Sequence, residues 1–271
     1  MTVGIVGLGL IGGSIGLALR EPGRTVIGCD VSPASEKTAL DRFCVDRIST
    51  FEETASADLV FVAVPPGAVV DTLERLKSVK GAETVVADCT SAKGEVQAWA
   101  EREKDPHFII SHPMAGHEKS GAAYASAWMF RSAKWILSPQ PWNTKSCLKL
   151  VEQAVKDMGA VPVRMDPAEH DREIARVSHL PHAFAAVLVL LKAGNSAIDV
   201  SGGSWRDLTR VAGVDPQLWT QIFMANRSEI SKALAEAEVH IAKLKTDLDS
   251  ADAASVEAFF KAARTAKQGG E

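Results

Sequence analysis

The feature that most constrains this chain is the glycine-rich segment Gly7-Leu8-Gly9-Leu10-Ile11-Gly12. An apolar run over residues 2–6 precedes it, and a helix-like run over residues 13–20 follows it. In a strand–turn–helix unit, the first glycine permits a tight turn, the second lets the backbone approach a pyrophosphate, and the third lets the helix pack on the strand. The free N–H groups at the helix start then bind the phosphates. The segment therefore predicts a dinucleotide-binding turn.

The end of the next apolar run, residues 25–29, indicates which dinucleotide binds. Asp30 follows this run, and an acid about 20 residues beyond the glycines is the usual ribose ligand. A carboxylate there accepts hydrogen bonds from the ribose hydroxyls and repels a 2′-phosphate. Residues 31–33 supply no cation, so NAD is favoured over NADP, although Lys37 is close. The alternative is a glycine turn that binds nothing, with Asp30 as a surface acid.

Length, charge and cysteine usage exclude several classes of protein. A chain of 271 residues suits two domains, and a net charge of −4 implies no basic face for nucleic acid. The four cysteines show no C-x-x-C spacing, which is typical of reduced thiols in a cytoplasmic protein. Because the first apolar run starts at residue 2, we expect no signal peptide, and we also expect no membrane span.

The first 165 residues alternate between apolar strands and amphipathic helices, which predicts an α/β, Rossmann-like doubly wound sheet covered on both faces. The predicted strands are residues 2–6, 25–29, 58–64, 84–88, 108–111, 134–138 and 161–164. The predicted helices are residues 13–20, 34–43, 68–77, 92–103 and 145–158. The pattern leaves open whether the later strands are antiparallel.

Unusual residues follow several of these strands, where ligands bind in such a sheet. We expect Val64 and Pro65 to line the cofactor site. His112 is expected in a loop just after a strand, where it is well placed as a general base with a near-neutral pKa, or is simply a hydrogen-bonded loop histidine. Ser91 is expected at the start of a helix, as an N-cap or as a group that orients His112 or a substrate hydroxyl.

The pattern changes at Asp166-Pro167, a good N-cap followed by proline at the first helical position. We place a dinucleotide-binding domain at residues 1–165 and an all-helical domain at residues 166–271. Its helices are expected at residues 168–192, from 217 to about 248, and at 253–265. These helices carry more apolar surface than they can easily bury alone, which predicts a homodimer through this domain rather than a monomer with helices packed on the sheet.

Two segments of the helical part carry candidate site residues. His179 and His182 flank Pro181, which should kink the long helix; without an H-E-x-x-H pattern or a third ligand we expect no metal, and histidines satisfied in a helix interface are the alternative. Arg210 ends a segment with two flexible glycines and is suited to clamp a carboxylate, unless Asp207 is its buried partner. Trp219, in the following helix, is expected to close an apolar wall.

Taken together, these segments resemble the prephenate/arogenate dehydrogenase family of tyrosine biosynthesis over essentially the whole chain. The matching segments are Gly7 to Ser14, Ser91, His112-Pro113-Met114-Ala115-Gly116 with Glu118-Lys119-Ser120-Gly121, Ser178-His179-Leu180-Pro181-His182, and Arg206-Asp207-Leu208-Thr209-Arg210. The resemblance implies an NAD-dependent oxidoreductase with a small-molecule substrate. It also implies a dimer built by the helical domain and an active site between the two domains, without an added regulatory or mutase segment.

The resemblance also implies roles for individual residues. NAD takes hydride from C4 of a cyclohexadiene while His112 accepts the hydroxyl proton, and CO2 then leaves from C1. Ser91 hydrogen-bonds the same hydroxyl, Arg210 binds a substrate carboxylate, and His179 orients the substrate. Glu118 attracts the ammonium of arogenate or acts near the mouth of the site.

The Glu-Lys-Ser-Gly segment is frequent in prephenate-type relatives, so prephenate is favoured, with arogenate or dual specificity as the alternative. Two more distant alternatives remain. One is another dehydrogenase of this build, such as a β-hydroxyacid dehydrogenase or an imine reductase, although we find no matching lysine motif near Gly194-Asn195. The other is a non-catalytic protein that senses NAD.

Overall fold

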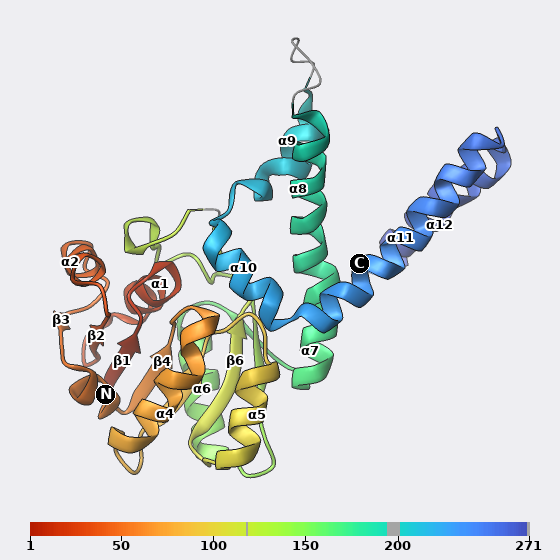
Figure 1. The fold of residues 1–271 in the computed structure, drawn as a ribbon. Coiled ribbons are helices and arrows are strands. Elements are labelled where there is room, and N and C mark those ends of the chain that lie inside the picture. The colour runs from red at the N-terminus through yellow and green to blue at the C-terminus, as the bar shows by residue number, and fades with distance from the viewer. Residues whose placement is uncertain (118, 194–200, 270–271) are drawn as a thin grey trace. The chain divides into compact units, whose positions relative to one another are not determined.

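The computed structural model describes residues 1–117, 119–193 and 201–269. Two compact units divide at Asn226: Met1–Asn226 and Arg227–Glu271. The first unit contains an eight-stranded sheet together with the helices that cover it and those that follow it as far as residue 225, and the second consists of two helices (Figure 1). The domain boundary expected near residue 165 stays a prediction.

The sheet has the order β3-β2-β1-β4-β5-β6-β7-β8. Its strands are β1 (Thr2–Val6), β2 (Thr25–Cys29), β3 (Arg47–Ile48), β4 (Leu59–Val62), β5 (Val85–Asp88), β6 (Phe108–Pro113), β7 (Lys134–Ser138) and β8 (Val161–Arg164). Strands β1 to β6 are parallel, β7 pairs with β6 antiparallel, and β8 is parallel to β7. This order places the carboxyl ends of β1 and β4 side by side, as a doubly wound sheet requires.

Helices cover both faces of the sheet, and Figure 1 shows α4 and α5 in front of it. The helices of this part are α1 (Leu10–Leu19), α2 (Pro33–Asp41), α3 (Phe51–Ala55), α4 (Val69–Val79), α5 (Gly94–Glu103) and α6 (Lys145–Asp157), with short turns η1 (Pro66–Ala68) and η2 (Ala122–Tyr124). Because alternate residues of a strand face opposite sides, Leu59 and Phe61 join the core under α1 and α6. Val60 and Val62 join the core under α4 and α5.

The predicted α/β fold is confirmed, and the differences are local. Strand β3 and helix α3 were not predicted, since a two-residue strand and a five-residue helix leave almost no periodic signal. Strand β6 extends two residues beyond its predicted end, to Pro113, because it pairs with the antiparallel β7 there. Helix α5 begins at Gly94 rather than at residue 92.

The long helix after the sheet runs from Pro167 to Lys192 in three parts: α7 (Pro167–Ile174), a π-helical turn η3 (Ala175–His179) and α8 (Leu180–Lys192). Asp166 caps it, accepting hydrogen bonds from the N–H groups of Ala168 and Glu169 at 2.9 and 3.1 Å. The kink that was expected at Pro181 is therefore a widened, π-helical turn just before this proline. Such turns are often found at functional sites.

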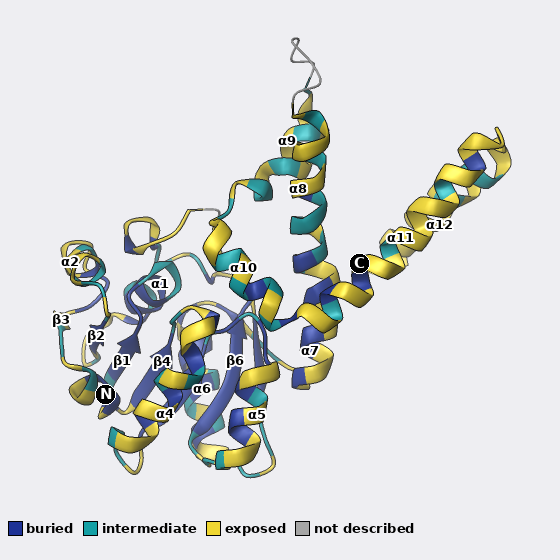
Figure 2. Cartoon of the chain, viewed as in Figure 1, coloured by how far each residue is buried: buried dark blue, intermediate teal, exposed yellow. Residues whose placement is uncertain are grey.

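Much of the apolar surface of α8 is exposed in a single chain, and exposed and intermediate residues follow one another along this helix (Figure 2). The 26-residue run is long and apolar enough to cross a membrane by length and composition alone, although we expected no such segment. Only 22% of its most apolar window is buried. Its first turns carry buried His170 and Asp171, both hydrogen-bonded within the sheet-bearing unit, so part of this run belongs to a polar site.

The remaining helices are α9 (Gly203–Thr209), η4 (Arg210–Gly213), α10 (Pro216–Ala225), α11 (Arg227–Asp249) and α12 (Ala253–Gly269). The single helix expected from residue 217 to about 248 is wrong. It breaks at Asn226, which is buried and has left helical geometry at φ −114° and ψ 27°. The side chain of Asn226 binds residues of the preceding long helix, and this tertiary contact accompanies a break that periodicity does not reveal.

Candidate active site

The glycine turn after β1 packs directly against the end of β4. Gly7 has a φ of +96°, a backbone conformation that favours glycine, and a Cβ there would lie 2.7 Å from the carbonyl oxygen of Ala63. A Cβ on Gly12 would lie 1.9 Å from the carbonyl oxygen of Gly7. Val64 and Pro65 follow at the same place, so the predicted cofactor residues of β1 and β4 come together.

The rest of the turn fits a dinucleotide. Helix α1 starts with Gly9 at its N-cap, without a side-chain cap and without an acid in its first turn, so its first N–H groups face outward for an anion. The carboxylate of Asp30 lies beside the turn and accepts hydrogen bonds from the N–H groups of Leu8 (2.7 Å) and Ser32 (2.8 Å). It is thereby held where a ribose would bind.

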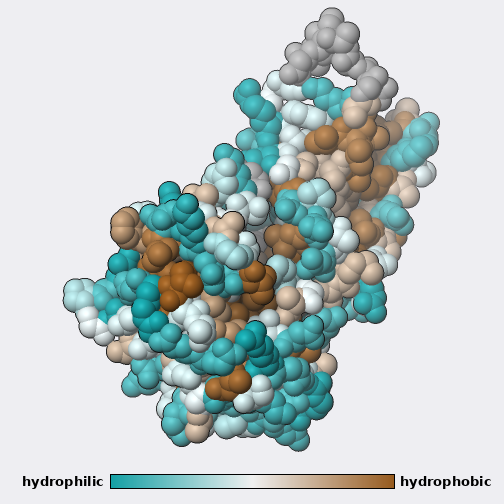
Figure 3. Space-filling model, turned by 60° about the vertical axis from the view of Figure 1, so that its left-hand side comes forward, coloured by the Kyte–Doolittle hydropathy of each residue, from teal (hydrophilic) through white to brown (hydrophobic). Residues whose placement is uncertain are grey.

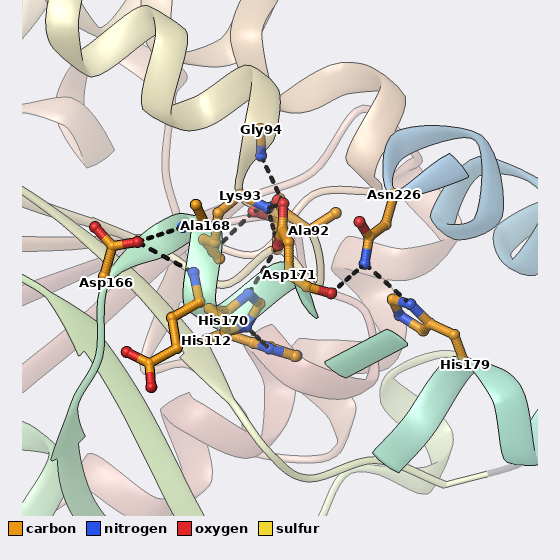
Figure 4. A network of polar contacts seen from close by, with 12 residues as sticks. Ala92, Lys93, Gly94, His112, Asp166, Ala168, His170, Asp171, His179 and Asn226 are labelled. Atoms are coloured by element: carbon orange, nitrogen blue, oxygen red, sulfur yellow. Dashed lines mark hydrogen bonds and ion pairs between the residues drawn. The ribbon is translucent and has the colours of Figure 1, made fainter. Parts of the chain in front are cut away.

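His112 lies inside strand β6, not in a loop after it, and only 8% of its surface is exposed. Its Nδ1 lies 2.8 Å from Nε2 of His170, and Nδ1 of His170 lies 2.8 Å from Oδ1 of Asp171. Figure 4 shows this row of side chains, with His170 and Asp171 contributed by α7 (Figure 4). The expected loop position was wrong because the pairing with β7 prolongs β6 through Pro113.

Sequence reasoning missed His170 and Asp171, although a signal was present. Pro167, His170, Asp171 and Ile174 are the buried residues of α7, at the i, i+3, i+4, i+7 spacing of one helix face. Two ionisable side chains on an inward face indicate a polar site, since buried polar groups must be hydrogen-bonded.

Asp171 joins three parts of the fold. Its carboxylate accepts hydrogen bonds from the N–H groups of Lys93 (2.8 and 3.1 Å) and Gly94 (3.1 Å) at the start of α5, where the helix dipole favours negative charge. The backbone carbonyl of Asp171 accepts a hydrogen bond from Nδ2 of Asn226 at 2.8 Å. Nδ2 of Asn226 also lies 3.3 Å from Nδ1 of His179. His112 and His179 therefore belong to one connected network.

A buried ion pair supports the strand ends beneath this network. Nζ of Lys93 lies 2.6 Å from Oδ2 of Asp88 and donates to the carbonyl oxygen of Ser111 at 2.6 Å. Ser91 lies between Asp88 and Lys93 in sequence, but it does not cap α5. The N-cap position of α5 is Lys93, and no side chain caps the helix. The hydrogen-bond partner of His112 Nδ1 is His170, so that nitrogen is not oriented by Ser91.

Two aromatic residues of α10, Trp219 and Phe223, lie close to His179. Trp219 of α10 stacks on His182 with ring centroids 3.6 Å apart, and its ring centroid lies 6.2 Å from that of His179. Arg210 is exposed and close enough to His182 to lower the pKa of its imidazole, after burial as the main cause. Asp207 is exposed, so it is not the buried partner of Arg210 considered above. Glu118 lies outside the described residues.

Burial keeps the histidines of this site neutral near pH 7. Burial lowers the pKa of His112 well below its ordinary 6.5, with smaller contributions from His170 and Lys93. Burial also lowers the pKa of His170, against the hydrogen bond to Asp171. It lowers the pKa of His179 to about 4. No group of three metal-ligating side chains occurs among the described residues.

Because His179 is protonated more readily in the unfolded chain, at an ordinary pKa of 6.5, acid should destabilise the fold. Between about pH 6.5 and pH 4 the unfolded state binds the extra proton, so the free energy of unfolding falls with falling pH, by on the order of 2–3 kcal/mol. Denaturant titrations from pH 7 to 4.5 should show a shallower pH dependence for His179→Gln. His240→Gln, on the exposed face of α11, is the control, and equal slopes for all proteins would refute the expectation.

The fold and the glycine turn define a nucleotide-binding dehydrogenase with an imidazole at the carboxyl end of its sheet. The family model described as "Prephenate dehydrogenase, nucleotide-binding domain" matches residues 15–164, and that described as "Prephenate dehydrogenase, dimerization domain" matches residues 166–262. The chain belongs to the prephenate dehydrogenase family.

Individual relatives agree with the family models. The chain is 32% identical to a prephenate dehydrogenase of Bacillus subtilis, over 99% of this chain and 76% of that protein. It is similar to the crystal structure of prephenate dehydrogenase from Aquifex aeolicus in complex with hydroxyphenyl propionate and NAD+, with a TM-score of 0.90, 30% identity and coverage of 100% and 98%. A Synechocystis arogenate dehydrogenase matches with a TM-score of 0.83 and 26% identity, over 100% of both chains.

Proposed function

We propose that this protein catalyses the NAD-dependent oxidative decarboxylation of prephenate to 4-hydroxyphenylpyruvate, a step of tyrosine biosynthesis. The observation that carries the proposal is the buried, neutral imidazole of His112 at the carboxyl end of β6, in a sheet whose first turn fits a dinucleotide. Membership of the family supports the substrate class.

NAD, when bound at the glycine turn, supplies the acceptor for the hydride that leaves C4 of the substrate. His112 accepts the proton of the C4 hydroxyl, since its lowered pKa leaves the ring unprotonated at neutral pH. The resulting C4 ketone draws electrons from the C1–carboxylate bond, and CO2 leaves as the ring becomes aromatic. The protein therefore needs one base, one carboxylate-binding group and an apolar wall against the ring.

The remaining candidate residues supply these groups. Arg210 binds a substrate carboxylate through two parallel hydrogen bonds, which its planar guanidinium is suited to form. Trp219 forms the apolar wall, supported by its stacking on His182. His179 orients the substrate, and its link to Asn226 supports a fixed ring position. Ser91 hydrogen-bonds the C4 hydroxyl.

Turnover of prephenate, followed by NADH absorbance, tests the proposed function directly. We expect NADH formation with prephenate and NAD, and weaker activity with NADP because of Asp30. Faster turnover of arogenate than of prephenate would assign the other substrate. No turnover of either, together with measurable NAD binding, would favour a protein that senses NAD and would overturn the proposal.

Arg210→Lys should separate substrate binding from chemistry. A lysine keeps the charge but loses the planar, bidentate donor pair. We expect KM for prephenate to rise by roughly 10- to 100-fold, from the loss of about 1.5–3 kcal/mol of charged hydrogen bonding, while kcat changes little. Arg206→Lys, one turn earlier on α9, is the matched control and should leave KM unchanged. An unchanged KM for Arg210→Lys would remove Arg210 from the substrate site.

We also propose a cytoplasmic homodimer formed through the helical domain. The large apolar side chains of α8 that are exposed in one chain are Val187, Val189, Leu190 and Leu191. Figure 3 shows hydrophobic surface gathered in the upper part of this view (Figure 3). A contiguous apolar patch of this kind is typical of a protein interface. Sedimentation equilibrium should give twice the chain mass of 28.9 kDa.

A further inference from the structure

We propose that His170 and Asp171 are positioning residues that fix the tautomer of His112, with the proton on Nδ1 and a bare Nε2 directed to the substrate. The inference deepens the proposed function and rests on it for the identity of the proton that His112 accepts. It assigns a role to two buried residues that belong neither to the glycine turn nor to the carboxylate-binding segment. Both lie on the inward face of α7.

Asp171 fixes which ring nitrogen of His170 carries the proton. Both oxygens of the Asp171 carboxylate already accept hydrogen bonds from backbone N–H groups at the start of α5. These donors and the positive end of the helix dipole favour the ionised carboxylate, which only accepts hydrogen bonds. The contact of 2.8 Å between Oδ1 and Nδ1 of His170 therefore requires the proton of His170 to be on Nδ1.

The tautomer of His170 in turn fixes that of His112. A neutral imidazole with a proton on Nδ1 has an unprotonated Nε2, which only accepts. Nε2 of His170 lies 2.8 Å from Nδ1 of His112, so Nδ1 of His112 donates and carries the proton of that ring. Nε2 of His112 is then the only ring nitrogen left to accept a proton. Orientation of a histidine by a partner on its other nitrogen is a general device of catalytic sites.

The charges around His112, His170 and Asp171 suit an imidazole of His112 that becomes positively charged during turnover. Lys93 is neutralised by its ion pair with Asp88, and His179 is kept neutral near pH 7 by burial. Asp171 is the uncompensated carboxylate nearest to His170 in this network. When His112 takes the substrate proton on Nε2, its Nδ1 proton stays in the hydrogen bond to His170. Asp171 then stabilises the positive charge through His170.

Asp171→Asn is the main test, because it keeps the shape and reverses the hydrogen bond. The amide oxygen accepts from the start of α5, so the NH2 group points to Nδ1 of His170. His170 then carries its proton on Nε2 and donates to His112, whose own proton moves to Nε2. We expect kcat to fall on the order of 10²–10⁴-fold, with KM for prephenate and the Kd for NAD unchanged. Asp166→Asn, on the same helix, is the control and should keep full activity.

Nitrogen NMR of the imidazoles provides a readout that does not depend on turnover. In uniformly 15N-labelled holoenzyme, the His112 signals, assigned by their loss in His112→Asn, should indicate the Nδ1–H tautomer. In Asp171→Asn they should indicate the Nε2–H tautomer. An Nε2–H tautomer in the unaltered protein would overturn the inference. The Nδ1–H tautomer without any prephenate turnover would instead uphold it and defeat the proposed function.

Conservative replacement of His170 distinguishes tautomer control from structural support. In His170→Gln the amide oxygen can take the place of Nε2 and accept from His112, whereas His170→Leu offers no acceptor. We expect His170→Gln to keep kcat within about tenfold and His170→Leu to lose on the order of 10²-fold or more. The double variant His170→Gln/Asp171→Asn should be more active than Asp171→Asn alone. Equal losses in all four variants would show that the pair only supports the fold.

Discussion

His112→Asn is expected to bind prephenate and NAD with nearly normal affinity and to turn over on the order of 10²–10⁴ times more slowly. Asparagine can donate its amide N–H to His170 in place of Nδ1, so the buried contact survives, but it has no basic nitrogen. Stopped-flow measurement of NADH formation separates binding from chemistry. His107→Asn, at the turn before β6, changes the same residue type away from the site and should be silent. Near-normal turnover in His112→Asn would remove His112 as the base.

The pH dependence of the unaltered protein should agree with this assignment. A base must be unprotonated, so kcat/KM is lost as pH falls through the pKa of His112. Burial places that pKa well below 6.5, and His170, Lys93 and His179 lower it further. We therefore expect kcat/KM to stay level as pH falls through 6.5 and to decline only at lower pH.

Gly12→Ala is expected to destroy the nucleotide-binding turn. The new Cβ would lie 1.9 Å from the carbonyl oxygen of Gly7, a backbone atom that cannot move aside without opening the turn. Overpacking of this kind costs about 3 kcal/mol or more. Denaturant titration should therefore show a lower free energy of unfolding without any ligand, and NAD binding should be lost. An unaltered stability would contradict the packing described for α1 and β1.

Gly9→Ala is the matched comparison, since no atom lies within 4 Å of a Cβ built at Gly9. Its backbone at φ −81° and ψ −155° is open to alanine, so the unfolding free energy should change by less than about 0.5 kcal/mol. The methyl group would nevertheless stand where the backbone approaches a pyrophosphate. We expect the affinity for NAD to fall by about tenfold or more. Normal NAD binding in Gly9→Ala would mean that the phosphates bind elsewhere.

Local patterns identified most of the elements. Short apolar runs gave β1, β2, β7 and β8 with their observed bounds, and Asp166-Pro167 marked the start of α7. These features depend on neighbours in sequence, which is why they can be read without the fold. Elements that depend on distant partners were missed or misplaced. The last residues of β6 require β7, and the break at Asn226 accompanies its contacts with Asp171 and His179.

The sequence by itself determined the nucleotide-binding turn, with Gly7, Gly12 and Asp30 in their expected relation. Glycine spacing and a following acid are local requirements of such a turn. Only the tertiary structure revealed what surrounds His112. His170 and Asp171 lie 58 and 59 residues further along the chain, and Lys93 anchors them from another helix. Burial and hydrogen-bond direction set the protonation of an imidazole, and both arise only when these distant segments pack together.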